Sequence, residues 1–504
     1  MKSLCVLLTG AVLPGLAGCA HYAAAGDEVS QAVEQWHRTR ADEVRGPSGP
    51  GGGQGRVPLT GEEGAGGRDA EDVIDSTEAT LSDYVAQALE RNPSVKAAIA
   101  HVQAKLERIP QVTSLSDPVL RAIVRPEPIQ TAAGDMYFTL GVGQKFPLPA
   151  KLDRAGRMAA ADVRMAIEQL NATRLRVIAD VEKAYYRLYL TDRSIELAEA
   201  NRRLLEELEG VVASQYRVGR VQQEDLLRVQ MELSSLRNDE SRYRRQRESA
   251  AAALNQLLDR SSVLSLPETR PIGLTRIDAS VEELMRLAGE HNPELAALVH
   301  QSERDRAAVE LADLGYWPEM DLGVEWTYVE PRDAARPPIN PETGSRPLPI
   351  RKSEAGDDNW ALGVQFNVPI WFERIEAAKR EARMRLEKTR HEMRAATNLV
   401  HFRIHDAWVQ VQTVQDTIRL LQSTLLPQAR QTYEVSLASY QGGKADFLTV
   451  IENWRLALDF ELMLHREMAA LETAYSALQR EVGLELVRRE WAAAEPADVQ
   501  EHER

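Results

Sequence analysis

The strongest constraint on the fold is that the chain carries the same sequence pattern twice. The segment LSDYVAQALERNP at 81–93 returns as VEELMRLAGEHNP at 281–293. Phe-Pro-Leu at 146–148 returns as Val-Pro-Ile at 368–370, and the wider spacing of this pair places an insertion in the second copy. Two copies of one unit predict a pseudo-symmetric molecule in which each element occurs twice.

The duplication and the composition divide the chain into five segments. We predict a signal peptide at 1–18, a Gly-rich tether at 19–76, a first repeat at 77–275, a second repeat at 276–487 and a polar tail at 488–504. The tether is polar and has no periodicity, so it has too little apolar surface to offset the entropy of ordering.

The N-terminus has the layout of a secretion signal. Lys2 precedes an apolar run at 4–16, which is too short to span a membrane as a stable helix. The ending Leu-Ala-Gly-Cys resembles a bacterial lipobox, and this implies that Cys19 is lipidated and that the protein is retained at the outer membrane. A chance cysteine near an ordinary cleavage site is the alternative. Cys5 lies in the signal, so no thiol remains for disulfides, metal binding or catalysis.

The charge and the composition narrow the function. The net charge is −15 with no basic cluster, which argues against a nucleic-acid partner. Aromatic residues make up only 6% of the chain, while helix-forming residues dominate. We therefore predict a mainly α protein with long helices and one elongated body rather than several ordinary domains.

Each copy predicts the same order of helices. A helix near 78–91 is followed by an Asn-Pro pair (Asn92, Asn292), which suits an N-cap with proline at the first helical position. The long helices after Pro149 and Pro369 carry apolar residues at alternating steps of four and three, a heptad seam that requires a neighbouring helix. Pro427 is expected to kink or break the second long helix.

Two short strands per copy are predicted between the helices. Apolar residues alternate with polar ones at 136–142, 320–328 and 360–368, and more weakly at 118–125. Aromatic residues gather at the strand ends, as they do at membrane interfaces: Trp317, Trp371 and Phe372 at one end, and Tyr328 and Trp360 at the other. We favour membrane strands; a soluble sheet with one apolar face is the alternative.

Four strands cannot close a barrel, and an open sheet edge in lipid leaves backbone groups unsatisfied. Bacterial barrels begin near eight strands. The chain is therefore expected to oligomerise, two copies giving eight strands and three giving twelve. The helices would then form a sleeve below the pore.

At this point the sequence resembles the TolC-type outer-membrane efflux proteins. The resemblance covers about 77–487 and depends on an ordered set of marks found twice: the Asn-Pro helix starts, QKFPL at 144–148 with NVPIW at 367–371, and Tyr-x-x-Gly turns followed by Asp-Leu-Leu at 225–227 and Thr-Val-Ile-Glu at 449–452. The family implies a homotrimer with a twelve-stranded transmembrane β-barrel on an α-helical periplasmic tunnel. The lipobox is similar to that of the lipid-anchored branch, which serves resistance-nodulation-division pumps for drugs or heavy metals.

The resemblance implies partners and a docking surface. The partners are a periplasmic adaptor, an inner-membrane pump and outer-membrane lipid. The two Gly turns join helices at the far tip of the tunnel, and an ordinary helix cap is part of their role. By resemblance they also dock the adaptor. The turn residues are Arg217, Val218, Gly219 and Arg220 in the first copy, and Gln441, Gly442, Gly443 and Lys444 in the second.

The resemblance also implies an aperture. Glu452 and Asp225 match acidic positions near the family's gate, and Tyr440 matches its gating tyrosine. Carboxylates ringed by symmetry repel one another and attract cations, which can select or gate; the alternative is the solvated face of a charged helix. Ala445 stands where an Arg would complete the family's latch, so that latch is in doubt here.

Nothing in the sequence predicts an enzyme, a cofactor or a metal centre. There is no phosphate loop and no nucleophile elbow. His401 and His405 have zinc-like spacing but no third ligand nearby, so a surface or core pair is expected. We predict a passive outer-membrane efflux channel. An outlet for type I protein secretion and a structural coiled-coil lipoprotein are the alternatives.

Overall fold

A computed structural model describes residues 79–131, 133–219, 221–273, 275–331, 341–345, 356–486 and 489–490. The predicted signal peptide, Cys19, the tether and most of the tail lie outside the described residues. The chain forms two compact units, which we call the strand unit (104–164 and 300–391) and the hairpin unit (79–103, 165–299 and 392–490). Each unit draws on both sequence repeats.

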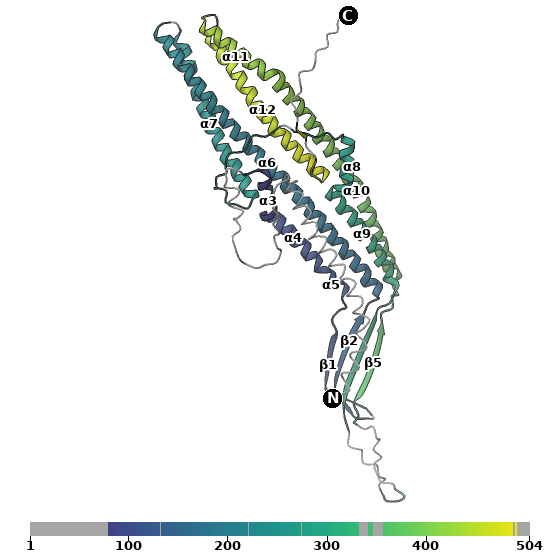
Figure 1. Ribbon diagram of the computed structural model, residues 1–504. Coiled ribbons are helices and arrows are strands. Elements are labelled where there is room, and N and C mark those ends of the chain that lie inside the picture. Colours follow the sequence, from purple (N-terminus) through teal and green to yellow (C-terminus); the bar gives the residue numbers. More distant parts are fainter. Residues whose placement is uncertain are drawn as a thin grey trace, which may run out of the picture. The chain divides into compact units, whose positions relative to one another are not determined.

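The two halves of the chain share one order of elements, except that in the second half a 3-10 turn (Leu314–Tyr316) replaces the third helix and the long helix is divided in two (Figure 1). The first half contains α3 (Leu81–Arg91), α4 (Pro93–Leu106), α5 (Arg108–Thr113), β1 (Val119–Gln130), β2 (Asp135–Phe146), α6 (Pro149–Arg217) and α7 (Gln223–Leu257). The second contains α8 (Val281–His291), α9 (Pro293–Asp313), β4 (Met320–Glu330), β5 (Asn359–Phe366), α10 (Phe372–Leu420), α11 (Leu426–Gln441) and α12 (Phe447–Val482). A short pair, β3 (Thr275–Arg276) and β6 (Arg489–Glu490), lies in the hairpin unit. The predicted mainly α, duplicated fold with a small β part is confirmed.

The Asn-Pro pairs begin α4 and α9 as predicted. The side-chain Oδ1 of Asn92 accepts from the backbone N–H of Ser94 at 2.9 Å, and that of Asn292 accepts from Glu294 at 2.9 Å. Each Nδ2 also donates to a backbone carbonyl near the end of a distant helix, Asn92 to the last residue of α7 and Asn292 to Glu481 of α12. One buried asparagine therefore satisfies a helix start and a helix end at once.

The four strands form one antiparallel sheet in the order β1-β2-β4-β5. The centre of the sheet joins the two sequence repeats, because β2 pairs with β4 and sets Thr139 opposite Thr327, with 3.0 Å between their hydroxyl oxygens. On the other face, the Trp326 ring packs against Phe138 and Trp360. The predicted alternation of polar and apolar faces is confirmed.

The first strand is longer than its pattern predicts. The expected segment ends near Arg125, but β1 continues through Pro126 and Pro128 to Gln130. Because β1 is an edge strand, the missing N–H groups of the prolines remove no hydrogen bond to a neighbouring strand on its outer side. The register between β1 and β2 shifts between Val124 and Ile129.

The long helices bury the predicted seam. In the hairpin unit, Val400 and Ile404 of α10 pack against Leu284 of α8 and Val482 of α12. Among the described residues, none of the helices combines the length and the apolar character that a transmembrane segment needs.

Pro427 interrupts the second long helix as predicted, in the form of a single π-helical turn, Leu421–Leu425. The backbone N–H of Leu426 donates to the carbonyl of Leu421, five residues earlier. Since Pro427 has no N–H to give the carbonyl four residues before it, a shift to longer hydrogen bonds keeps the backbone paired.

Candidate functional site at the hairpin turns

The turns between α6 and α7 and between α11 and α12 have matching backbones. Gly219 and Gly443 adopt φ of 74° and 71°, and each donates its N–H to the carbonyl of the tyrosine three residues earlier at 2.9 Å. The N–H of Lys444 also donates to the carbonyl of Ser439, which completes a Schellman cap. A Cβ added to either glycine meets nothing within 4 Å. The positive φ alone therefore requires glycine.

The predicted turn residues lie on the surface. Val218 is 68% exposed, and Arg217, Gln441 and Lys444 are exposed as well. Arg220 lies outside the described residues. In the first turn the exposed apolar side chain of Val218 lies next to Arg217, whereas the second turn presents the polar Gln441 and the cationic Lys444.

Asp225 and Tyr440, predicted as aperture residues, lie near one another behind the turns. The Tyr440 ring packs against Phe447 at 5.1 Å and is only 7% exposed. Burial, together with the charges of Asp225 and Asp446, raises the pKa of Tyr440 to about 12. Burial also raises the pKa of Asp225, as do the nearby charges of Asp446 and Glu224. The Tyr440 hydroxyl has no hydrogen-bond partner among the described residues.

Sequence reasoning missed Asp446. It is the N-cap residue of α12, immediately before Phe447, and an acidic residue before an apolar helical run is a recognised cap pattern. That pattern locates the helix start but not the approach of this carboxylate to Asp225.

Glu452 does not belong to this group. It is exposed on α12, and within the described residues no hydrogen bond or ion pair links it to Asp225 or Tyr440. Ala445 is partly buried beside the turn and supplies no charge. The residues gathered here are therefore two carboxylates and a buried tyrosine, with no cation from position 445.

The two helical hairpins share a core below the turns. Phe447 and Trp454 of α12 are buried in one cluster with Leu205 of α6 and Leu233 of α7. Polar contacts reinforce this core, because the indole N–H of Trp454 donates to Asn201 at 2.8 Å, and Arg455 forms an ion pair with Glu232. The hairpins are thus joined at defined points.

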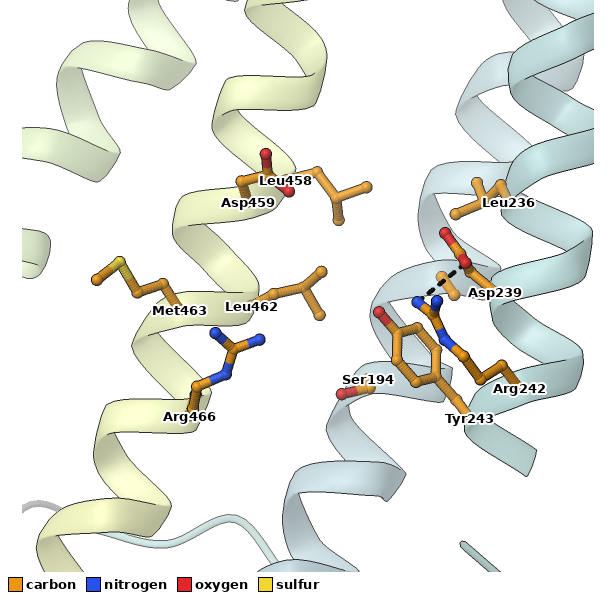
Figure 2. Close-up of a pocket in the computed structure, with 11 residues that line it drawn as sticks. Ser194, Leu236, Asp239, Arg242, Tyr243, Leu458, Asp459, Leu462, Met463 and Arg466 are labelled. Atoms are coloured by element: carbon orange, nitrogen blue, oxygen red, sulfur yellow. Dashed lines mark ion pairs between the residues drawn. The ribbon is translucent and has the colours of Figure 1, made fainter. Parts of the chain in front are cut away.

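A cavity of about 430 Å³ lies between α6, α7 and α12, farther from the turns (Figure 2). Leu236, Leu458 and Leu462 supply apolar lining, and an ion pair of 2.9 Å joins Asp239 to Arg242 in its wall. No group of three or more His, Cys, Asp or Glu side chains in the described part of the chain is placed to hold a metal ion.

One family model matches most of the chain. The model of the family described as outer membrane efflux protein matches residues 84–260 and 284–484. No curated protein is matched by sequence.

Solved structures of outer-membrane proteins share the fold. VceC from Vibrio cholerae has a TM-score of 0.63 at 18% identity, over 80% of this chain and 96% of VceC. The CmeC outer membrane channel from Campylobacter jejuni has a TM-score of 0.64 at 15% identity, over 87% and 94%. The MtrE outer membrane channel from Neisseria gonorrhoeae, in an open state, has a TM-score of 0.64 at 18% identity, over 81% and 89%.

Proposed function

Because the chain belongs to the outer membrane efflux protein family, we propose that it is the outer-membrane channel of a tripartite efflux system. In this role it conducts small toxic compounds, drugs or heavy-metal ions, passively from a periplasmic adaptor and an inner-membrane pump to the exterior. The observation that carries the proposal is the four-stranded sheet, which has an exposed apolar face and whose two edge strands pair with no further strand among the described residues.

The sheet is incomplete as a membrane structure. Its edge strands are β1 and β5, and among the described residues no further strand pairs with their outer edges. Apolar side chains on one face are exposed, Leu120 by 72% and Leu362 by 76%. In lipid this face is well solvated, but the open edges cost several kcal/mol for each unpaired backbone group. Three copies joined edge to edge give a closed barrel of twelve strands, within the range of bacterial barrels.

The hairpins supply the docking surface in this proposal. The turn residues 217–220 and 441–444 meet the adaptor, and in the second turn the Schellman cap fixes the backbone that presents them. Asp225, Tyr440 and Asp446 act at the aperture, where three copies bring six carboxylates of this kind together and disfavour a closed, dry constriction. Glu452 is exposed on α12, and in the trimer its three copies form a second acidic ring that is separate from Tyr440.

The remaining parts of the proposal concern location and organisation. Cys19 carries the lipid that holds the chain at the outer membrane of a Gram-negative bacterium, and the hairpins lie in the periplasm. Residues 77–275 and 276–487 act as two outer-membrane efflux repeats, with 1–18 removed as signal peptide, 19–76 as lipidated tether and 488–504 as polar tail. A single acyl-type anchor binds a membrane weakly, so the barrel provides the main attachment.

The test is to reconstitute the full-length protein in planar bilayers and, in parallel, to complement a deletion strain. We expect a cross-linked trimer, discrete conductance steps, and restored resistance to drugs or metals. If the protein is a monodisperse monomer in mild detergent and gives no conductance in bilayers, the channel proposal is wrong and the structural lipoprotein is favoured. If the protein conducts, but the deletion strain keeps its resistance and no longer secretes a polypeptide, the type I secretion outlet is favoured.

A further inference from the structure

One polar contact between the hairpins involves a histidine. His465 of α12 lies against Tyr189 of α6, with 3.1 Å between Nδ1 and the tyrosine oxygen and 6.1 Å between ring centroids at 64°. Tyr189 is 1% exposed, so the contact is largely shielded from solvent. A titratable side chain therefore joins two helices that belong to different hairpins.

The direction of this bond depends on the tautomer and charge of the histidine. Burial raises the pKa of Tyr189, so its hydroxyl carries a proton at neutral pH. When that hydroxyl donates, Nδ1 of His465 accepts, and only a neutral imidazole can accept there. Protonation of His465 removes this acceptor.

The charges around the contact oppose protonation. From α6, the Arg193 guanidinium lies 5.7 Å from the centre of the Tyr189 ring and forms an ion pair with Glu196. From α12, Glu461 is the charged neighbour. Burial lowers the pKa of His465 and Arg193 lowers it further, while Glu196 and Glu461 act in the opposite direction. The net direction is downward.

The cavity lies directly beyond this contact. Ser194 and Ala198 of α6 line one side, and Leu462 and Arg466 of α12, on either side of His465 along the helix, line the other (Figure 2). Among the described residues, the next polar contact between the two helices on the side of the turns is the one from Trp454 to Asn201, and on the other side the Tyr186 hydroxyl donates to Glu472 at 3.1 Å. Between His465 and Trp454, side chains of α6 and α12 line this cavity, so the packing between the two helices is incomplete there.

We propose that the Tyr189–His465 contact is a proton-operated catch between the two hairpins, closed when His465 is neutral and released when it is protonated. Protonation places an imidazolium beside the Arg193 guanidinium and removes the acceptor for the tyrosine proton, and α12 then moves away from α6, which widens the cavity between them. The catch would make the relative position of the hairpins depend on pH.

The sign follows from linkage. Because the folded-state pKa of His465 lies below the value of about 6.5 for an exposed imidazole, the contact contributes fully above that pH. Its contribution is lost progressively as the pH falls from about 6.5 towards the folded-state pKa. The catch is therefore closed in neutral surroundings and released in acid.

The test measures access to the interface. Ser194 is 6% exposed, so Ser194→Cys in the full-length protein reports opening by its rate of reaction with a dithiodipyridine probe. Ser235→Cys, exposed on α7, gives the reference rate in the same buffer and cancels the pH dependence of thiol chemistry. We expect the ratio of the two rates to rise about tenfold between about pH 8 and about pH 5.

Three variants sharpen the test. His465→Gln keeps a polar side chain but cannot titrate, so its ratio should be the same at both pH values. Tyr189→Phe lacks the hydroxyl and should show a raised ratio throughout. His101→Gln, at an exposed histidine of α4, should match the unsubstituted protein. A flat ratio in the unsubstituted protein, or an equal rise in His465→Gln, would overturn the proposal.

The consequence for transport rests on the proposed function, and the two can fail separately. In planar bilayers, acid should change the conductance of the unsubstituted channel more than that of His465→Gln, in which the aperture carboxylates still titrate. If no variant conducts while the labelling ratio still follows His465, the channel proposal fails and the catch stands. If all variants conduct with the same pH profile and the ratio is flat, the catch fails and the channel stands.

Discussion

Substitution of a turn glycine tests docking and folding separately in one experiment. Gly443 adopts φ of 71° and a Cβ there meets nothing within 4 Å. A tryptophan at this position therefore costs only the left-handed backbone conformation, about 1–2 kcal/mol, a modest part of the roughly 5–15 kcal/mol that holds a domain together. The trimer should survive, while a bulky ring covers the turn.

The assay is complementation of a deletion strain, with trimers and adaptor capture measured in the same cells. We expect Gly443→Trp to lose efflux and adaptor binding with normal trimer levels. Gly443→Asn, a residue that tolerates the left-handed region, should retain both. Gly210→Trp is the matched control, because Gly210 is also open to solvent but lies inside α6. Full efflux by Gly443→Trp at normal channel levels would refute the docking role of the turn.

Three further predictions follow from contacts in the two units. Asn292→Ala removes an N-cap and the donor to the Glu481 carbonyl, so hydrogen exchange at the start of α9 should report a loss of about 2–4 kcal/mol, and Asn292→Ser should recover the cap portion. Because the pKa of Asp225 is raised above the usual 3.8, protonation of Asp225 stabilises the turns as the pH falls through the window above 3.8. Asp225→Asn should show this stability already at neutral pH, measured by hydrogen exchange at the start of α7. Leu362→Arg on the apolar face of β5 should cost about 2–4 kcal/mol and reduce cross-linked trimers, whereas Ala361→Arg on the opposite face should assemble normally.

The parts of the fold that were predictable depend on short-range interactions. The Asn-Pro starts, the heptad seam, the alternation in the strands and the interruption at Pro427 each involve residues within a few positions of one another. Steric and hydrogen-bonding rules act over those distances, so the pattern alone indicates the element. The predicted end of β1 is wrong, because a strand tolerates proline only when it lies at the edge of a sheet, and the sequence pattern does not show which strand is at the edge.

The candidate site was only partly predictable. The turns were located from Tyr-x-x-Gly, because positive φ after a helix favours glycine at that spacing. Asp225 and Tyr440 were chosen by resemblance, and their proximity, like that of Asp446, depends on how α7 packs beside α11 and α12. Glu452 is acidic, as the resemblance implies, but it lies at an exposed position of α12.

The sequence by itself determined the kinds of element, their order and their repetition, since these depend on local periodicity and on caps. Only the tertiary structure decided that β2 pairs with β4 across the two repeats, that Asp446 approaches Asp225, and that Tyr189 bonds His465. Those partners are separated by well over a hundred residues. Their choice depends on which apolar faces bury each other, and this packing carries no short-range signature in the chain.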